Sequence, residues 1–343
     1  MDSKISLFGL SAEEIFSELG LSAKFRARQV FSWIYKGISN FDEMKNIDSA
    51  TRNILKEKAC LYSSSVSQVL KDPDGTIKLQ ITLNDKKAVE TVLLTDREGR
   101  KTACVSCQAG CPMKCAFCQT GHLGFSRNLT AGEIIEEFMF LEKEAGKLDN
   151  IVFMGMGEPM LNLDAIRKAI ALLSDAQGRG LSTKRITLST CGITKGIYDL
   201  ADNGPKIRLA ISLTSANEEL RNSLMPVNIS NPLAELKKAI AYYIEKTGKR
   251  VTLEAALMHE KNTSLASAKE MIAFSKGLDV YVNLIPWNPV ASLDFTRPSY
   301  KECESFLNYL KAGGINAGFR MQRGNSIAGA CGQLGKVDSE EDF

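Results

Sequence analysis

The chain has 343 residues, of which 44% are hydrophobic and 24% are charged. This balance is typical of a globular protein and excludes disorder as the main state. The net charge of +3 is too small to argue by itself for a nucleic-acid partner. No apolar run reaches the roughly 18 residues needed to span a bilayer, and the first ten residues lack the pattern of a signal peptide. We therefore expect a cytoplasmic protein without a membrane partner.

Residues 1–90 predict a small N-terminal α/β accessory domain. Ser11 and Glu14 form a capping box at the start of a helix that Gly20 ends. Two more helices are expected, in residues 22–37 and from Ser49 onward. Residues 77–83 alternate apolar and polar side chains, which predicts a strand, and residues 88–95 are its expected hairpin partner.

Residues 91–335 alternate apolar strands with amphipathic helices, which predicts βα units and a parallel sheet. With the strand near Cys104, six such units are present. We therefore expect an α/β fold with a partial (β/α)6 barrel, whose ligands bind at the carboxyl ends of the strands. The last segment, residues 336–343, is acidic and is expected to be a flexible tail.

Five of the nine cysteines fall within residues 104–118. An odd number of cysteines without a secretion signal argues against a disulfide framework. Two CxxC pairs could form a four-thiolate zinc site, on Cys104, Cys107, Cys115 and Cys118. The CxxxCxxC motif of Cys111, Cys115 and Cys118 could instead hold three irons of a 4Fe–4S cluster and leave the fourth iron open. The spacing favours the iron–sulfur cluster over zinc and over buried packing thiols.

Small polar residues stand at the expected ends of the strands. The second strand ends in GMGE, where Gly157 lets the backbone approach a ligand and Glu158 can accept a hydrogen bond from an ammonium group. Later strand ends carry Ser189, Ser212, Thr214 and Asn288. Each residue alone is equally consistent with a helix cap or a turn. Together they predict a cofactor site at the mouth of the barrel.

The cysteine motif, with Phe117 before its last cysteine at the start of a βα barrel, resembles the radical S-adenosylmethionine (SAM) superfamily. More closely, nearly the whole chain resembles the RlmN/Cfr family of radical SAM RNA methyltransferases, which act on adenine. Five segments carry this resemblance: CVSCQAGCPMKCAFCQTGHLGFSRNLT, FMGMGEPMLN, LRNSLMPVN, VNLIPWNP and ACGQL. The resemblance implies a 4Fe–4S cluster on Cys111, Cys115 and Cys118. It also implies SAM contacts at Gly157, Glu158, Ser189, Ser212 and Asn288.

Two residues depart from the family pattern. Thr214 stands where relatives usually carry histidine, and its hydroxyl or backbone could replace the imidazole contact to SAM. Cys107 stands where serine is more usual, and we interpret it as a bystander.

The resemblance implies a reaction that consumes two SAM molecules, because carbons 2 and 8 of adenine are too electron-poor to attack a sulfonium methyl group. Cys331, in ACGQL, would take a methyl group from one SAM, and a radical from the second would abstract hydrogen from that group. The methylene radical adds to adenine, and Cys104 releases the protein–RNA adduct by forming a disulfide with Cys331. Glu90 matches an acidic residue proposed to accept the ring proton, and the sequence does not decide between Glu90 and Cys104.

GEPMLN and LIPWNP resemble the RlmN branch, which methylates carbon 2 of an adenine in 23S rRNA and in some tRNAs. A carbon-8 methyltransferase similar to Cfr is one alternative, and a non-catalytic RNA-binding protein with structural zinc is another. The resemblance implies an electron donor such as flavodoxin or ferredoxin. We expect a monomer whose accessory domain contacts RNA.

Overall fold

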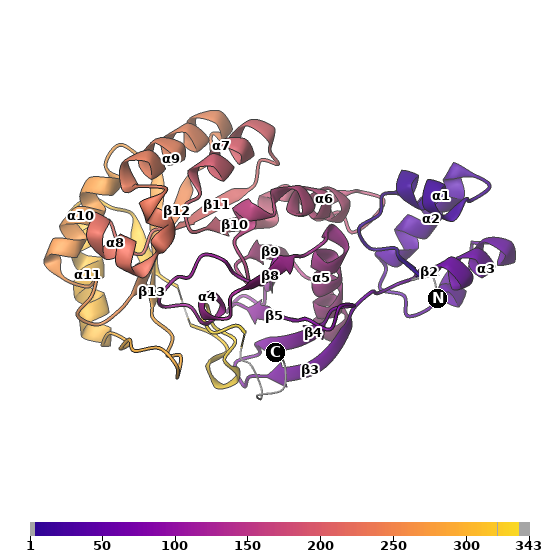
Figure 1. Ribbon diagram of the computed structural model, residues 1–343, viewed down its shortest axis with the longest axis horizontal. Helices are drawn as coiled ribbons and strands as arrows, with labels where there is room; N and C mark the ends of the chain where they lie inside the picture. The colour runs from indigo at the N-terminus through magenta and orange to yellow at the C-terminus, as the bar shows by residue number, and fades with distance from the viewer. Residues whose placement is uncertain (1–3, 321, 336–343) are drawn as a thin grey trace.

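The structure is a computed structural model that describes residues 4–320 and 322–335 (Figure 1). Its centre is a ten-stranded sheet in the order β14-β13-β12-β11-β10-β9-β6-β5-β4-β3. The tail expected at residues 336–343 lies outside the described residues. None of the described helices combines the length and the apolar character that a membrane crossing requires.

Three helices near the N-terminus lie together at one end of the molecule (Figure 1): α1 (Ala12–Leu19), α2 (Lys24–Ile34) and α3 (Ser49–Lys58). The Ser11–Glu14 capping box is present, and Gly20 ends α1 with a left-handed φ of 62°. A short parallel pair, β1 (Ile5–Ser6) and β2 (Ala59–Cys60), and the 3-10 turn Phe41–Glu43 complete this part. The helices expected from the sequence are thus confirmed.

A buried carboxylate and two glycines fix these helices to the rest of the chain. Glu136, on α5 (Ala131–Ala145), accepts hydrogen bonds from the backbone N–H groups of Ser63 and Ser64 at 2.7 and 2.9 Å. A Cβ on Gly9 would lie 2.7 Å from the backbone nitrogen of Gly132, at the start of α5. Glycine is therefore required where the two segments touch.

Three antiparallel strands connect this part to the barrel: β3 (Ser65–Lys71), β4 (Ile77–Thr82) and β5 (Ala88–Thr95). The expected hairpin of β4 and β5 is confirmed. β5 then pairs with β6 (Lys101–Val105), the first strand of the barrel. The division expected between residues 90 and 91 falls inside β5, and the sheet runs across it without interruption.

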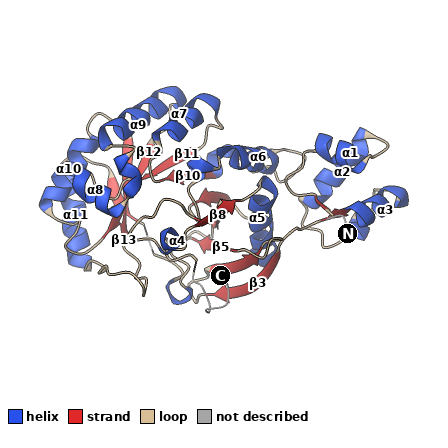
Figure 2. Ribbon diagram, viewed as in Figure 1, coloured by secondary structure: helices blue, strands red, loops and turns tan. Residues whose placement is uncertain are grey.

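Seven parallel strands form the open barrel: β6, β9 (Asn150–Phe153), β10 (Ile186–Thr190), β11 (Arg208–Ser212), β12 (Val251–Leu257), β13 (Val280–Pro286) and β14 (Ala317–Phe319). Figure 2 shows the helices on the outer side of these strands: α5, α6 (Leu163–Ser174), α7 (Thr194–Asn203), α9 (Leu233–Thr247), α10 (Leu265–Ser275) and α11 (Tyr300–Ala312). The short α8 (Glu218–Leu224) instead lies beyond the carboxyl end of β11, where Leu224 O accepts from Ala116 N at 2.9 Å. The expected partial barrel of six βα units is confirmed. The short β14 is a further strand that the sequence did not indicate.

The segment between β6 and α5 carries the CxxxCxxC motif. It contains β7 (Gln108–Gly110), α4 (Gln119–His122) and β8 (Phe125–Asn128), and β7 pairs with β8. A Cβ on Gly110 would lie 2.0 Å from the carbonyl oxygen of Gly124, so only glycine fits this crossing. The pairing of β7 with β8 therefore holds the two ends of the cysteine loop together.

Candidate active site

A cavity of about 950 Å³, counted with its open mouth, lies at the carboxyl ends of the parallel strands. We call it the main cavity. Its lining includes ten residues that the sequence analysis singled out from separate segments: Cys111, Cys115, Cys118, Gly157, Glu158, Ser189, Ser212, Thr214, Asn288 and Cys331. Parallel strands end at one edge of the sheet, so loops far apart in the sequence meet there.

Three cysteine side chains stand on the loop between β7 and α4. The loop is held by two backbone hydrogen bonds, from Cys111 N to Gly124 O at 2.7 Å and from Ala116 N to Leu224 O at 2.9 Å. Burial raises the pKa of the Cys111 thiol to about 12, and it also raises the pKa of Cys115 and Cys118. Bound iron would lower the pKa of these thiols again, because a metal cation deprotonates a thiol that coordinates it.

The structure gives no support to the zinc site considered from the sequence. Among residues 4–320 and 322–335, no three His, Cys, Asp or Glu side chains converge closely enough to hold a single ion. Cys107 is 2% exposed and packs in the hydrophobic core, whereas Cys104 lines a different cavity. The two CxxC pairs therefore do not meet. The donor set that remains is three soft thiols beside an open cavity, which fits an iron–sulfur cluster with one free iron.

Glu158 is held rigidly at the wall of the main cavity. Its carboxylate accepts from Met160 N at 3.0 Å and from Cys191 N at 2.8 Å. Burial raises the pKa of Glu158, and these amides act in the opposite direction. Each carboxylate oxygen keeps a second lone pair with which it can accept from an ammonium group.

Gly157 is required for a reason that the sequence did not indicate. Its φ is 106°, and a Cβ there would lie 2.8 Å from the backbone nitrogen of Gln108. The close approach that excludes a side chain is therefore to the β7 segment of the protein itself.

Asn288 has one satisfied and one free end. Its Nδ2 donates to the carbonyl oxygen of Cys331 at 2.9 Å. Its Oδ1 is buried and has no hydrogen-bond partner among the described residues. A buried acceptor without a donor is costly. A ligand in the main cavity could supply that donor.

The three hydroxyl residues lie on neighbouring strand ends. The Ser189 and Ser212 hydroxyl oxygens are 3.5 Å apart. Thr214 has a left-handed φ of 58°, and its N–H and carbonyl groups are occupied by Glu254 O and Asn262 Nδ2. The N–H of Thr214 is therefore engaged, whereas its hydroxyl and the second lone pair of its carbonyl oxygen remain able to contact a ligand.

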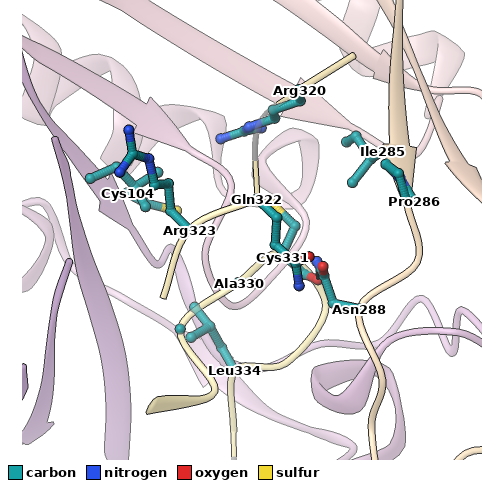
Figure 3. Close-up of a pocket in the computed structure, with 12 residues that line it drawn as sticks. Cys104, Ile285, Pro286, Asn288, Arg320, Gln322, Arg323, Ala330, Cys331 and Leu334 are labelled. Atoms are coloured by element: carbon teal, nitrogen blue, oxygen red, sulfur yellow. Dashed lines mark hydrogen bonds between the residues drawn. The ribbon is translucent and has the colours of Figure 1, made fainter. Parts of the chain in front are cut away.

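A second cavity, of about 520 Å³ with its mouth, is lined by both Cys104 and Cys331 and is called the cysteine cavity. Figure 3 shows Cys104, Cys331 and Arg320 around it. Both thiols are free. Burial, and next the nearness of Cys331, raise the pKa of Cys104 to about 12, while Arg320 acts in the opposite direction. Cys331 and Asn288 line both cavities.

The loop that carries Cys331 is anchored on two sides. On one side, Gln119 N donates to Gly332 O and the Thr120 hydroxyl donates to Leu334 O, both at 2.8 Å. On the other side, the loop is hydrogen-bonded to the turn between β3 and β4, where Gly324 N donates to Asp74 Oδ2 at 2.9 Å. The position of Cys331 thus depends on contacts with segments remote in sequence.

Glu90 lines neither the main cavity nor the cysteine cavity. Its carboxylate lies 2.8 Å from the Lys78 ammonium and accepts from Gly335 N at 2.6 Å. Lys78 was missed from the sequence, because the apolar alternation of β4 gave no signal that its lysine is buried. No local sequence pattern indicates that Arg320 lies beside both cysteines either.

Comparisons with known proteins agree with this geometry. Residues 105–270 match the radical SAM superfamily, and residues 5–61 match the ribosomal RNA large subunit methyltransferase N-terminal domain. A protein of Treponema denticola named "Probable dual-specificity RNA methyltransferase RlmN" is 58% identical over 334 residues, which cover 97% of this chain and 96% of that protein. The chain belongs to the RlmN family of dual-specificity RNA methyltransferases.

Two further comparisons extend over the same length. The RlmN relative of Thermotoga neapolitana is 41% identical over 335 residues, with 96% of this chain and 97% of that protein covered. The crystal structure of a radical SAM methyltransferase from Sphaerobacter thermophilus superimposes with a TM-score of 0.92 at 38% identity, and covers 96% of this chain and 99% of that one. RlmN membership gives this chain its cofactors, a 4Fe–4S cluster and SAM.

Proposed function

We propose that this RlmN-family enzyme methylates carbon 2 of a specific adenine in 23S rRNA, and of an adenine in some tRNAs, through a methylated Cys331. The names of its relatives, dual-specificity RNA methyltransferases, support an RNA substrate. The observation that carries the mechanism is the position of Cys331, which lines both the main cavity and the cysteine cavity. One sulfur can thereby face SAM on one side and the substrate and Cys104 on the other.

The main cavity is proposed to bind both cofactors. Cys111, Cys115 and Cys118 would hold the cluster, which when bound supplies the electron that cleaves SAM to a 5′-deoxyadenosyl radical. The fixed carboxylate of Glu158 accepts from the ammonium group of SAM, and the free Oδ1 of Asn288 accepts from a second donor. Gly157, Ser189, Ser212 and Thr214 supply the remaining wall of the SAM site.

Cys331 and Cys104 divide the covalent work. Cys331 accepts a methyl group as a thiolate and becomes a thioether. After loss of a hydrogen atom, its methylene radical bonds to carbon 2 of adenine. The adduct radical then has to lose one electron, which the oxidised cluster could take back, and the carbon-2 proton, which a base of the protein accepts. When the Cys104 thiolate attacks the Cys331 sulfur, a disulfide forms, the carbon–sulfur bond breaks, and the methylene carbon keeps the electron pair and takes up a proton to become the methyl group of the product. The free thiols of both residues in one cavity support this sequence.

The surroundings of the two candidate proton acceptors favour Cys104. Cys104 lines the cysteine cavity, and burial makes its thiolate strongly basic by raising its pKa to about 12. The Glu90 carboxylate is instead engaged by Lys78 and by Gly335 N. We therefore assign removal of the ring proton to Cys104, and the fixing of the end of the Cys331 loop to Glu90.

Two parts of the proposal concern partners. We propose that flavodoxin or ferredoxin reduces the cluster and that the enzyme acts as a monomer. The accessory helices α1 to α3 are proposed to contact the RNA, and the match of residues 5–61 to a methyltransferase N-terminal domain supports this role.

The test is mass spectrometry of nucleosides from 23S rRNA and tRNA of cells that contain the protein, lack it, or carry only Cys331→Ala. We expect 2-methyladenosine in both RNA classes with the native protein alone. Methylation at carbon 8 would instead establish the Cfr-like activity. An unchanged nucleoside profile across the three strains would refute the proposal.

A further inference from the structure

The segment LRNSLMPVN contains the largest fully buried side chain of the described residues, that of Arg221. The segment forms the end of α8 and the 3-10 turn Pro226–Ile229. Arg221 is 0% exposed. A guanidinium stays charged in a protein, so this position holds a permanent positive charge inside the barrel.

The guanidinium of Arg221 contacts neutral acceptors. It donates to the carbonyl oxygens of Leu213 at 3.1 Å and Cys191 at 2.7 Å, and to the side-chain oxygen of Asn228. A longer contact of 3.4 Å reaches Ser212 O. Among the described residues no carboxylate oxygen lies within 4.0 Å of it, and Glu218 is reached only through the amide of Asn228. A buried charge without an opposite partner is strongly unfavourable, so the site calls for negative charge nearby.

The proposed cluster ligands lie on the same side. Leu224, one turn after Arg221, accepts from Ala116 N in the cysteine loop at 2.9 Å. Cys115 packs against the group of Leu224, Met225 and Cys191. Negative charge on the cysteine loop is therefore the partner that Arg221 lacks.

We propose that Arg221 is the fixed countercharge of the 4Fe–4S cluster and raises its reduction potential. This inference rests on the proposed cluster site at Cys111, Cys115 and Cys118. A cluster in its oxidised state with three thiolates carries one net negative charge, and uptake of one electron from an external reductant doubles that charge. A buried cation stabilises the doubly charged state more than the singly charged one, and the low interior dielectric strengthens the effect.

The experiment is a redox titration of the reconstituted holoenzyme with dithionite, followed by electron paramagnetic resonance of the reduced cluster. Arg221→Gln keeps hydrogen-bonding atoms but removes the charge, and Arg221→Lys keeps the charge but removes the planar donor set. For Arg221→Gln we expect a reduction constant at least about tenfold lower, which is about 59 mV for one electron. Arg221→Lys should stay close to the native value.

Arg179→Gln is the matched control. The side chain of Arg179 is also largely covered, with 8% exposed, but it pairs with Glu142 and Leu148 O and lines neither the main cavity nor the cysteine cavity. Its substitution should leave the potential unchanged. Iron and sulfide analysis of the native protein comes first, because a native protein without a cluster would refute the proposed cofactor site itself.

Each result for the Arg221 variants decides the inference. A lowered potential in Arg221→Gln alone supports it, as does a cluster that loads in Arg221→Lys with native potential but not in Arg221→Gln. An unchanged potential in a loaded Arg221→Gln overturns it. Equal shifts in both variants, or failure of both to load, would also overturn it, because they would assign Arg221 to hydrogen bonding and packing rather than charge.

Discussion

Cys104 at the end of β6 and Cys331 in the loop after β14 line the same cavity, and of these two only Cys331 also lines the main cavity. Both are free thiols. This asymmetry supports the separate roles proposed for them, because a group transferred from SAM bound in the main cavity could reach Cys331 without passing Cys104. Cys104 is placed to act on what Cys331 carries.

The first prediction separates these two cysteines. Cys331→Ala removes the methyl acceptor, so neither the protein nor the RNA should be methylated, while iron content stays native. Cys104→Ala leaves the acceptor intact but removes the thiolate that releases the product. It should accumulate a covalent protein–RNA species, visible as a shifted band in denaturing, non-reducing electrophoresis.

The control for this prediction is the double variant, which should show no shifted band because the tether never forms. Normal turnover in Cys104→Ala would contradict the assigned roles. So would an adduct that persists in Cys331→Ala.

The second prediction concerns the cluster ligands. Alanine at Cys111, Cys115 or Cys118 should abolish iron binding and all methylation, because each sulfur holds one iron. Cys107→Ser should keep iron and activity, since Cys107 lies in the core outside the main cavity. Placing a hydroxyl there should lower the free energy of unfolding by about 1–3 kcal/mol. Iron analysis and thermal unfolding would check both statements, and a full iron complement in any of the three alanine variants would refute the ligand set.

The third prediction follows from the raised pKa of Cys104, about 12 in the folded protein. The reactive form is the thiolate, and below the pKa its fraction rises about tenfold for each pH unit. Release of the adduct in a single turnover should therefore accelerate about tenfold from pH 7 to 8 and continue to rise at pH 9. Rapid quench followed by electrophoresis would measure it. A rate that levels off near pH 7 would show that Cys104 is already ionised in the adduct.

The fourth prediction tests Glu90 through its two contacts. Glu90→Gln leaves the buried Lys78 ammonium without an opposite charge, so the free energy of unfolding should fall by about 3 kcal/mol. Loosening at Gly335 should slow RNA methylation through the Cys331 loop. Because we assign the ring proton to Cys104, no adduct should accumulate. Accumulation of the adduct would show that Glu90 takes that proton.

A matched variant, Lys78→Met, would separate the two effects of Glu90. It removes the ammonium but keeps the Glu90 carboxylate, so an effect shared by both variants belongs to the ion pair. Chemical denaturation measures the stability, and mass spectrometry of the RNA measures the methylation.

Local sequence determined the elements and the identity of most candidate site residues. The capping box of Ser11 and Glu14 joins residues only three positions apart, and the apolar–polar alternation of β4 lies within one short segment. Because both features are local, the sequence alone predicts them. The same holds for the three cysteines of the motif and for the polar residues at strand ends, because a βα repeat places every strand end at one edge.

Tertiary structure alone decided what surrounds those residues. Lys78 is buried because Glu90 on the next strand and the Cys331 loop cover it, and no local pattern encodes either neighbour. The surroundings of Arg221 are carbonyl groups that follow two different strands and the cysteine loop that packs beside α8. Only the folded chain brings these groups around its guanidinium. Burial and charge pairing depend on contacts between segments that are distant in sequence, and these contacts form only when the chain folds.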